Sequence, residues 1–141
     1  MNNPIFPCLW FDNNAKAAAE FYCSVFKNSR IIDDTPLAVT FEINGSKMMG
    51  LNGGPQFKPT EAVSLVIDCN TQEEIDYYWD TLTADGGAES MCGWIRDKFG
   101  FSWQIVPSVI VDLLKAPERS DRVMAAVMKM KKLDLKTLIE A

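Results

Sequence analysis

The sequence predicts an α+β fold built from two tandem βαβββ modules, followed by helices. Two observations support this prediction. The chain repeats itself, because Leu9–Phe26 aligns with Leu65–Leu82 without a gap. Each copy then reads as a strand, a helix and three further strands. Such a duplication is typical of two similar modules that share one architecture.

The repeat includes polar positions as well as apolar ones. Asp12 aligns with Asp68, and Asn14 aligns with Asn70, in phase with apolar and aromatic matches around them. Apolar periodicity alone is common in unrelated helices and strands. The shared polar positions therefore favour duplication over coincidence.

The first strand and the helix of each module have clear local signals. Short apolar runs of strand length precede residues with helical spacing. Polar side chains before each helix are typical N-caps, and Thr71 with Glu74 fits a capping box. We expect the first strands at residues 5–11 and 62–69, with the helix caps at residues 12–14 and 70–71.

Three more strands follow each helix. Asn44-Gly45 is a strong hairpin signal, and Phe99-Gly100 is the corresponding turn in the second module. The strands are expected at residues 29–33, 36–43, 46–52, 87–91, 93–98 and 101–106.

The chain after Pro107 has a different pattern. Amphipathic helical segments are expected at residues 109–114, 121–132 and 134–140, with a break at Ala116-Pro117. We predict that residues 1–107 hold the paired modules, 1–52 and 61–107, joined by a linker at 53–60. Residues 108–141 are predicted to form a helical extension that packs on the domain or on a dimer partner.

Composition excludes several classes of function. The 141 residues carry a net charge of −5, which argues against nucleic acid as a partner because phosphates require a basic face. No apolar run approaches the roughly 20 residues of a membrane span. The N-terminus lacks the pattern of a secretory signal, so we expect a cytoplasmic protein that binds no membrane.

The sequence contains no histidine, which removes Ser-His-Asp and Cys-His catalysis and imidazole metal ligands. The four cysteines form no C-x-x-C pair. Cys8, Cys69 and Cys92 lie in or beside predicted strands, where we expect small buried apolar side chains.

Several motifs together resemble one known family. They are PCLWFDNNAKAAAEFY, MGLNGGPQFKP, SLVIDC, CGWIRDKFGFSWQIVP and RVMAAVMKMKKLDL. They resemble the PhnB-like family, often labelled 3-demethylubiquinone-9 3-methyltransferase, within the glyoxalase/bleomycin resistance/dioxygenase or vicinal oxygen chelate superfamily. The resemblance covers nearly the whole chain. It implies modules that curl around a cleft, and a homodimer.

The family label implies S-adenosylmethionine as a cofactor. Enzymes that use it commonly hold it at a glycine-rich turn between a strand and a helix. Gly53-Gly54 and Gly86-Gly87 do not follow a strand and open a helix in this way. The residues therefore give the methyltransferase function little support, and no cofactor is expected.

The resemblance also raises the question of a metal. Metal-dependent relatives place His, Glu or Gln ligands on the first and last strands of each module. On the first strands, alternation leaves open Phe6, Cys8 or Trp10 and their counterparts Ala62, Ser64 or Val66, none of which is a carboxylate or imidazole. On the last strands, counting from the turn glycines gives Met49 and Gln104. Cys8 and Gln104 make at most half a site, because hard ions prefer carboxylates and zinc prefers thiolate, imidazole or carboxylate. No metal is expected.

We therefore predict a metal-free protein that binds a small molecule in an apolar cleft. The residues predicted to line the cleft are Cys8, Trp10, Met49, Ser64, Trp94 and Gln104. Strand alternation predicts that Trp103 packs beneath a helix if Gln104 faces the cleft. Arg96 shares a face with Trp94 and is expected to pair with Asp97, Glu89 or Asp85 rather than with an anionic ligand.

Three alternatives remain open. One is an enzyme of the superfamily, with Cys8 as nucleophile or Glu42 as base. Another is the methyltransferase that the family label implies. The third is a structural role, with the methionine-rich tail helix as an interface. No catalytic residue is assigned.

Overall fold

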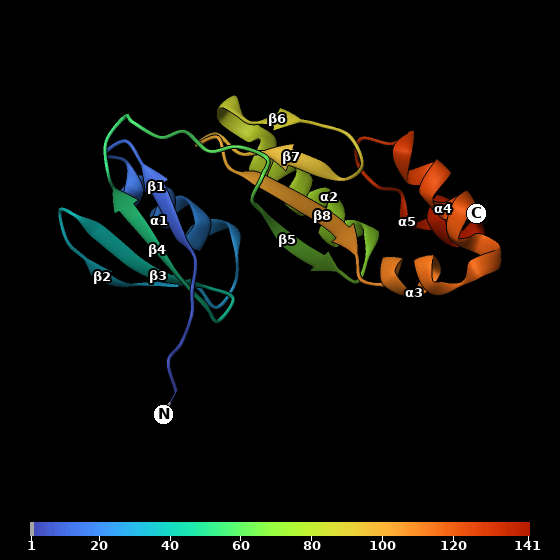
Figure 1. Ribbon diagram of the computed structural model, residues 1–141, viewed down its shortest axis with the longest axis horizontal. Coiled ribbons are helices and arrows are strands. Elements are labelled where there is room, and N and C mark those ends of the chain that lie inside the picture. Colours follow the sequence, from blue (N-terminus) through green and yellow to red (C-terminus); the bar gives the residue numbers. More distant parts are fainter. Residues whose placement is uncertain (1) are drawn as a thin grey trace. The chain divides into compact units, whose positions relative to one another are not determined.

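The computed structural model describes residues 2–141, which divide between Pro59 and Thr60 into two compact units. Each unit contains a four-stranded mixed sheet with a helix against one face (Figure 1). This arrangement confirms the predicted α+β fold with two βαβββ modules. Within residues 2–141, every helix is too short or too polar to span a lipid bilayer.

The first unit holds the first sheet, whose strand order is β1-β4-β3-β2. The parallel pair is β1 with β4, and the other pairs are antiparallel. Asn44 and Gly45 both have positive φ, as a tight hairpin turn requires. The elements are β1 (Cys8–Phe11), α1 (Ala15–Val25), β2 (Arg30–Asp34), β3 (Ala38–Ile43) and β4 (Ser46–Asn52).

Helix α1 covers one face of this sheet through small side chains. Ala15, Ala18 and Ala19 are fully buried, so the helix backbone lies close to the strands. Gly50 of β4 matches this close approach, since an added Cβ would lie 3.1 Å from the Cβ of Ala15. Tyr22 stacks on Phe41 of β3 at 6.2 Å between ring centroids.

The two helices of the modules are capped differently. The predicted capping box of α2 (Gln72–Thr83) is confirmed, because the Thr71 hydroxyl accepts from the Glu74 backbone N–H and the Glu74 carboxylate accepts from the Thr71 backbone N–H. The predicted cap of α1 is wrong, since Asn14 makes no side-chain capping bond. Asn52 Oδ1 instead accepts from the Ala15 N–H at 3.0 Å.

The second unit begins with a sheet of the same topology, in the order β5-β8-β7-β6. Its parallel pair is β5 with β8. A short 3₁₀ turn, Ala84–Gly86, follows the helix. The elements are β5 (Ser64–Cys69), α2 (Gln72–Thr83), β6 (Ala88–Glu89), β7 (Trp94–Arg96) and β8 (Ser102–Pro107).

The turn between β7 and β8 is longer than the sequence predicts. It spans residues 97–101, and the carboxylate of Asp97 organises it by accepting from the backbone N–H groups of Phe99 and Phe101 at 2.9 and 3.1 Å. Its second oxygen accepts from Trp103 Nε1 at 2.8 Å. The turn is therefore built around a buried carboxylate rather than around Phe99-Gly100 alone.

Three helices complete the second unit: α3 (Ile110–Lys115), α4 (Pro117–Met128) and α5 (Leu135–Glu140). Helix α4 starts four residues earlier than predicted, because Pro117 occupies a first-turn position that needs no N–H donor. Asp134 caps α5 as predicted, accepting from the Thr137 N–H. The three helices share a hydrophobic core, whose buried residues are Leu113, Val123, Val127, Leu133 and Leu138.

These helices are fastened to the second module by polar contacts. Gln72, at the start of α2, accepts from the Leu135 N–H at 2.8 Å and donates to the Leu133 carbonyl at 3.1 Å. Lys132 pairs with Asp76 of α2 at 2.9 Å. The tail therefore packs on its own second module, and its contact with a dimer partner stays a prediction.

Candidate functional site

The face of the second sheet that points away from α2 carries the candidate site. Pleating separates it from the face on which Ile95, Trp103 and Ile105 are buried in the core. As predicted, Trp103 lies on the face opposite Gln104 and is covered. The residues of β5, β7 and β8 that lie on this face include Ser64, Val66, Trp94, Arg96, Gln104 and the buried Ser102.

Gln104 is the polar centre of this face. Its Nε2 donates to Ser64 Oγ at 2.9 Å, which holds one end of the amide. The other end makes no hydrogen bond within residues 2–141. In register, Gln104 lies between Val66, which is 57% exposed, and the half-buried Trp94. A fixed amide with one open end thus stands between two apolar side chains.

Arg96 lies on the same face, two residues after Trp94, and is exposed. The predicted pairing with Asp97, Glu89 or Asp85 is wrong. No carboxylate lies within ion-pair distance of Arg96 in the described part of the chain. Asp97 is buried against Trp103 on the other side of the sheet, while Glu89 accepts from an indole N–H of α2.

A small cavity adjoins Arg96. Its volume is about 150 Å³, and its lining includes Trp94, Arg96 and Ser102 together with the carboxylates Glu61 and Glu89. An indole, a guanidinium and a hydroxyl therefore meet at this cavity together with acidic groups. The combination suits a ligand with an apolar body and a few hydrogen-bonding atoms.

The predicted residues of the first module share a face of the first sheet. Cys8 and Met49 are directly opposed in the parallel pair β1–β4. Cys8 is exposed and Met49 is half-buried, so the prediction of a buried Cys8 is wrong, whereas Cys69 is fully buried as predicted. Trp10 lies on the same face of β1 as Cys8.

Trp10 is held by the linker that follows β4. Its Nε1 donates to the Gly54 carbonyl at 2.8 Å, and Phe57 meets its ring edge-on at 4.8 Å. Gly53 passes so close that an added Cβ would lie 2.3 Å from the indole. Much of the indole is therefore used for packing within the first unit.

The residue of the first module that corresponds to Gln104 is Leu51 rather than Met49. The repeat aligns Trp10 with Val66, and these residues pair with Leu51 and Gln104 respectively. Counting from the turn glycines misses this, because the β3–β4 hairpin has six residue pairs and the β7–β8 hairpin has three, so this position lies farther from the turn in the first module. Leu51 offers no donor or acceptor, which makes the position apolar in the first module.

The proposed nucleophile and base of the enzyme alternative are poorly placed for those roles. Partial screening of the sulfur from water raises the pKa of the Cys8 thiol above its ordinary value, which leaves less thiolate at neutral pH. Burial, with help from Glu74 and Asp68, raises the pKa of Cys69 to about 12. Glu42 pairs with Arg30 at 3.3 Å on the sheet surface.

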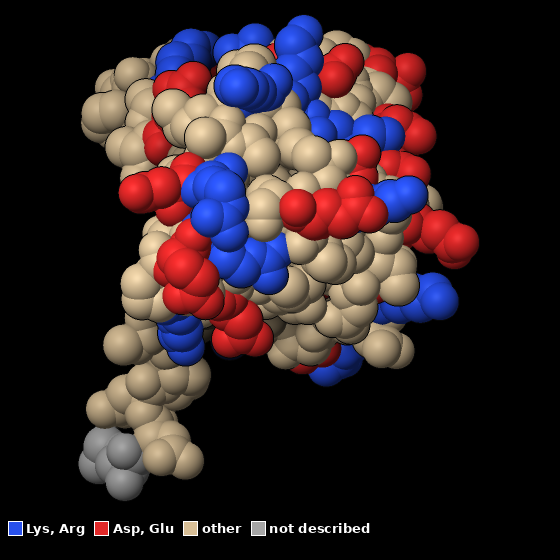
Figure 2. All heavy atoms as spheres, turned by 90° about the vertical axis from the view of Figure 1, so that its right-hand side faces the viewer, with Lys and Arg blue, Asp and Glu red and all other residues tan. Residues whose placement is uncertain are grey.

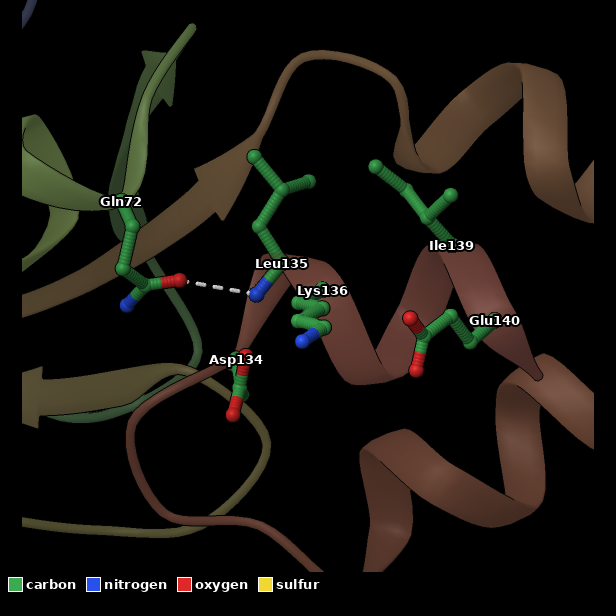
Figure 3. Close-up of a pocket in the computed structure, with 6 residues that line it drawn as sticks. All are labelled: Gln72, Asp134, Leu135, Lys136, Ile139 and Glu140. Carbon is green, nitrogen blue, oxygen red and sulfur yellow. Dashed lines mark hydrogen bonds between the residues drawn. The ribbon is translucent and has the colours of Figure 1, made fainter.

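A second hollow lies between the start of α2 and helix α5, with a volume of about 310 Å³ (Figure 3). Leu135 and Ile139 project into it from the same side of α5. The nearby amide of Gln72 is occupied at both ends, since its oxygen binds Leu135 and its nitrogen donates to Asp76 and Leu133. The Gln72 amide therefore holds the start of α5 to α2.

Comparison with known proteins identifies the family. A family model described as 3-demethylubiquinone-9 3-methyltransferase matches residues 3–106. The chain belongs to this family. No match was found among curated proteins. The family match stops one residue before β8 ends, so helices α3, α4 and α5 all lie beyond it.

Solved structures agree with this assignment. A PhnB protein from Bacillus cereus is 31% identical, covers 74% of this chain and 99% of its own, and superposes with a TM-score of 0.67. Protein PA1353 from Pseudomonas aeruginosa, 17% identical over 74% of this chain and 96% of its own, has a TM-score of 0.62. The family is thus PhnB-like, and the fold is glyoxalase-like.

The fosfomycin resistance protein FosX from Listeria monocytogenes, solved with Mn(II) and sulfate, shares the fold. It is 15% identical, covers 82% of this chain and 97% of its own, and has a TM-score of 0.60. In residues 2–141 of the present chain, no three Cys, Asp or Glu side chains come together to hold a metal. The candidate face offers an amide, hydroxyls and a guanidinium, a donor set that does not fit a divalent ion.

The methyl donor named by the family description does not fit either. Both strand-to-helix turns, residues 12–14 and 70–71, lack the glycines that allow a nucleotide to approach the backbone closely. Each sheet also has a single parallel pair rather than a parallel βαβ sheet. We derive no reaction through S-adenosylmethionine for this chain.

Proposed function

We propose that this PhnB-like chain is a metal-free, homodimeric protein that binds a small organic molecule on the sheet face centred on Gln104. The observation that carries the proposal is the Gln104 amide, fixed at one end by Ser64 and open at the other. A held, half-buried amide loses little freedom on binding, so its open end can select a ligand by one or two hydrogen bonds.

The surroundings indicate what the ligand looks like. Trp94 and Val66 supply apolar surface on either side of the amide. The unpaired guanidinium of Arg96 can interact with a carboxylate, a carbonyl or an aromatic face. We infer a flat, largely apolar ligand with a polar or anionic substituent. On the first module, we propose Cys8, Trp10 and Met49 as ligand-binding residues of that module's own sheet.

The four cysteines are all free thiols in the described chain, which supports a reducing compartment such as the cytoplasm as part of this proposal. The dimer is supported by the family resemblance. Both statements can be checked independently of ligand binding.

Native mass spectrometry of the purified chain with a panel of aromatic and carboxylated metabolites tests the function. The expected result is a dimer mass with a bound ligand, unchanged by EDTA. Gln104→Leu should weaken binding at least tenfold, which corresponds to about 1.4 kcal/mol. Ser64→Ala should weaken it by a smaller factor, because it frees the held end of the amide.

Ser46→Ala, an equivalent change at the exposed start of β4, serves as the matched control and should bind like the wild type. Loss of binding on EDTA treatment would contradict the metal-free proposal. Binding that is insensitive to Gln104→Leu would show that the ligand lies elsewhere. S-adenosylmethionine belongs in the panel, and its selective binding would revive the methyltransferase alternative.

A further inference from the structure

The C-terminal helices contain a groove that the family fold does not require. The family match ends at residue 106, and the groove lies between α4 and α5, with a volume of about 480 Å³. This size falls in the range of small-molecule sites. Its lining residues are Arg122, Ala125, Ala126, Lys129, Met130, Thr137 and Ala141.

The floor of the groove is apolar and made of small side chains. Ala125 and Ala126 leave the α4 backbone open to close approach, and Ala141 does the same on the side of α5. Met130 adds an unbranched side chain that adapts to the shape of a ligand. An extended alkyl chain is the kind of group that such a floor accommodates.

Two cations accompany this apolar floor. Arg122 and Lys129 are seven residues apart on α4 and its C-terminal cap, which places them about 10 Å apart along the axis. Neither has a carboxylate within ion-pair distance among residues 2–141. Arg122 donates only to the Glu118 carbonyl of its own helix.

The other arginine of this region is already occupied. Arg119 donates to the carbonyl oxygens of Leu138, Ile139 and Ala141 at the end of α5, so it holds the two helices together. Figure 2 faces the side of the molecule that carries these helices, where blue groups alternate with uncharged tan surface and with red acidic groups.

We propose that the α4–α5 groove binds an anionic amphiphile, a medium- or long-chain carboxylate. The alkyl chain lies on the alanine floor, and the carboxylate pairs with Arg122 or Lys129. A small inorganic anion would leave the apolar floor unused, and a neutral alkane would leave both cations unpaired. This site is separate from the Gln104 face and does not rest on the function proposed for it.

Isothermal titration calorimetry with sodium decanoate, below its micelle concentration, tests the proposal on the full chain. Decan-1-ol is the uncharged probe. Decanoate should bind at least tenfold more tightly than decanol. The double variant Arg122→Gln with Lys129→Gln should lose at least this factor, while Ala125→Phe should fill the floor and remove binding of both probes.

The matched control is the double variant Lys115→Gln with Lys136→Gln, which makes the same charge change at exposed positions outside the groove. It should bind decanoate like the wild type. Circular dichroism checks that each variant is folded. Gln104→Leu should also leave decanoate binding unchanged.

Several results would overturn the proposal. Equal affinity for decanoate and decanol, or equal losses in both double variants, would remove the role of the two cations. Loss of decanoate binding in Gln104→Leu would place the amphiphile on the second sheet instead. An Ala125→Phe variant that changes the oligomeric state and not decanoate binding would make the groove a protein interface.

Discussion

The buried side chain of Asp97 shapes the turn before β8, the strand that carries Gln104 of the candidate site. It is 1% exposed, and its two oxygens accept from two backbone N–H groups and from the Trp103 indole. Because these bonds shape the turn before β8, they set where the strand begins. The register that follows places Gln104 opposite Val66 and Trp94.

Asp97→Asn should therefore destabilise the protein. One oxygen is replaced by an NH₂ group that cannot accept, so at least one buried donor loses its partner, at a cost of about 1–3 kcal/mol. Urea denaturation followed by tryptophan fluorescence measures the change. Asp121→Asn, on the exposed side of α4, is the control and should stay within about 0.5 kcal/mol of the wild type. A similarly small effect at Asp97 would contradict its structural role.

Helix α1 shows how an element can take its cap from a distant strand. Asn52 ends β4, and its side chain accepts from the Ala15 N–H and donates to the Pro36 carbonyl at 3.1 Å. It thus joins the start of α1 to the strand beside β1 and to the loop before β3. Thr71, by contrast, caps α2 from the adjacent position in the sequence.

Replacing the two asparagines should separate these roles. We expect Asn52→Ala to cost about 1–2 kcal/mol, as the loss of a helix cap usually does. Asn14→Ala should cost less than about 0.5 kcal/mol, because its side chain makes no capping bond. Chemical denaturation of both variants checks the order. An Asn14 effect as large as that of Asn52 would favour the cap expected from the sequence.

At the scale of the whole molecule, the C-terminal helices are joined to the second module partly by an ion pair. The hydrogen bond that the Asp76 carboxylate accepts from Lys132 lowers the pKa of the Asp76 carboxyl, and a second hydrogen bond from Gln72 lowers it further. The bond to Asp76 raises the pKa of Lys132. The pair therefore contributes fully at neutral pH. The contribution of Asp76 is lost as the pH falls from the ordinary carboxyl value through its lower folded value.

Asp76→Asn should lower the free energy of unfolding at pH 7, and this difference from the wild type should shrink as the solution is acidified below the folded pKa of Asp76. Urea titrations at a series of pH values measure both curves. Asp112→Asn, at an exposed position of α3, should show no such pH-dependent difference. Parallel curves for Asp76→Asn and the wild type down to the lowest pH would exclude the ion pair as a stabilising link.

The sequence by itself determined the two βαβββ modules, the Asn44-Gly45 hairpin and the Thr71 capping box. These features depend on signals a few residues apart, such as positive φ at a turn or a hydroxyl three residues before a glutamate. The family could be predicted in the same way, because its motifs are contiguous stretches of the chain. The match at residues 3–106 confirms that prediction.

The tertiary structure alone decided which distant groups meet. The Asn52 cap lies 37 residues from its donor, and Gln104 is 40 residues from Ser64. Neither contact has a local signal, because the pairing of strands that are distant in the sequence brings these residues together. The α4–α5 groove is more local, since its lining residues lie between Arg122 and Ala141, but it too forms only when the two helices pack together.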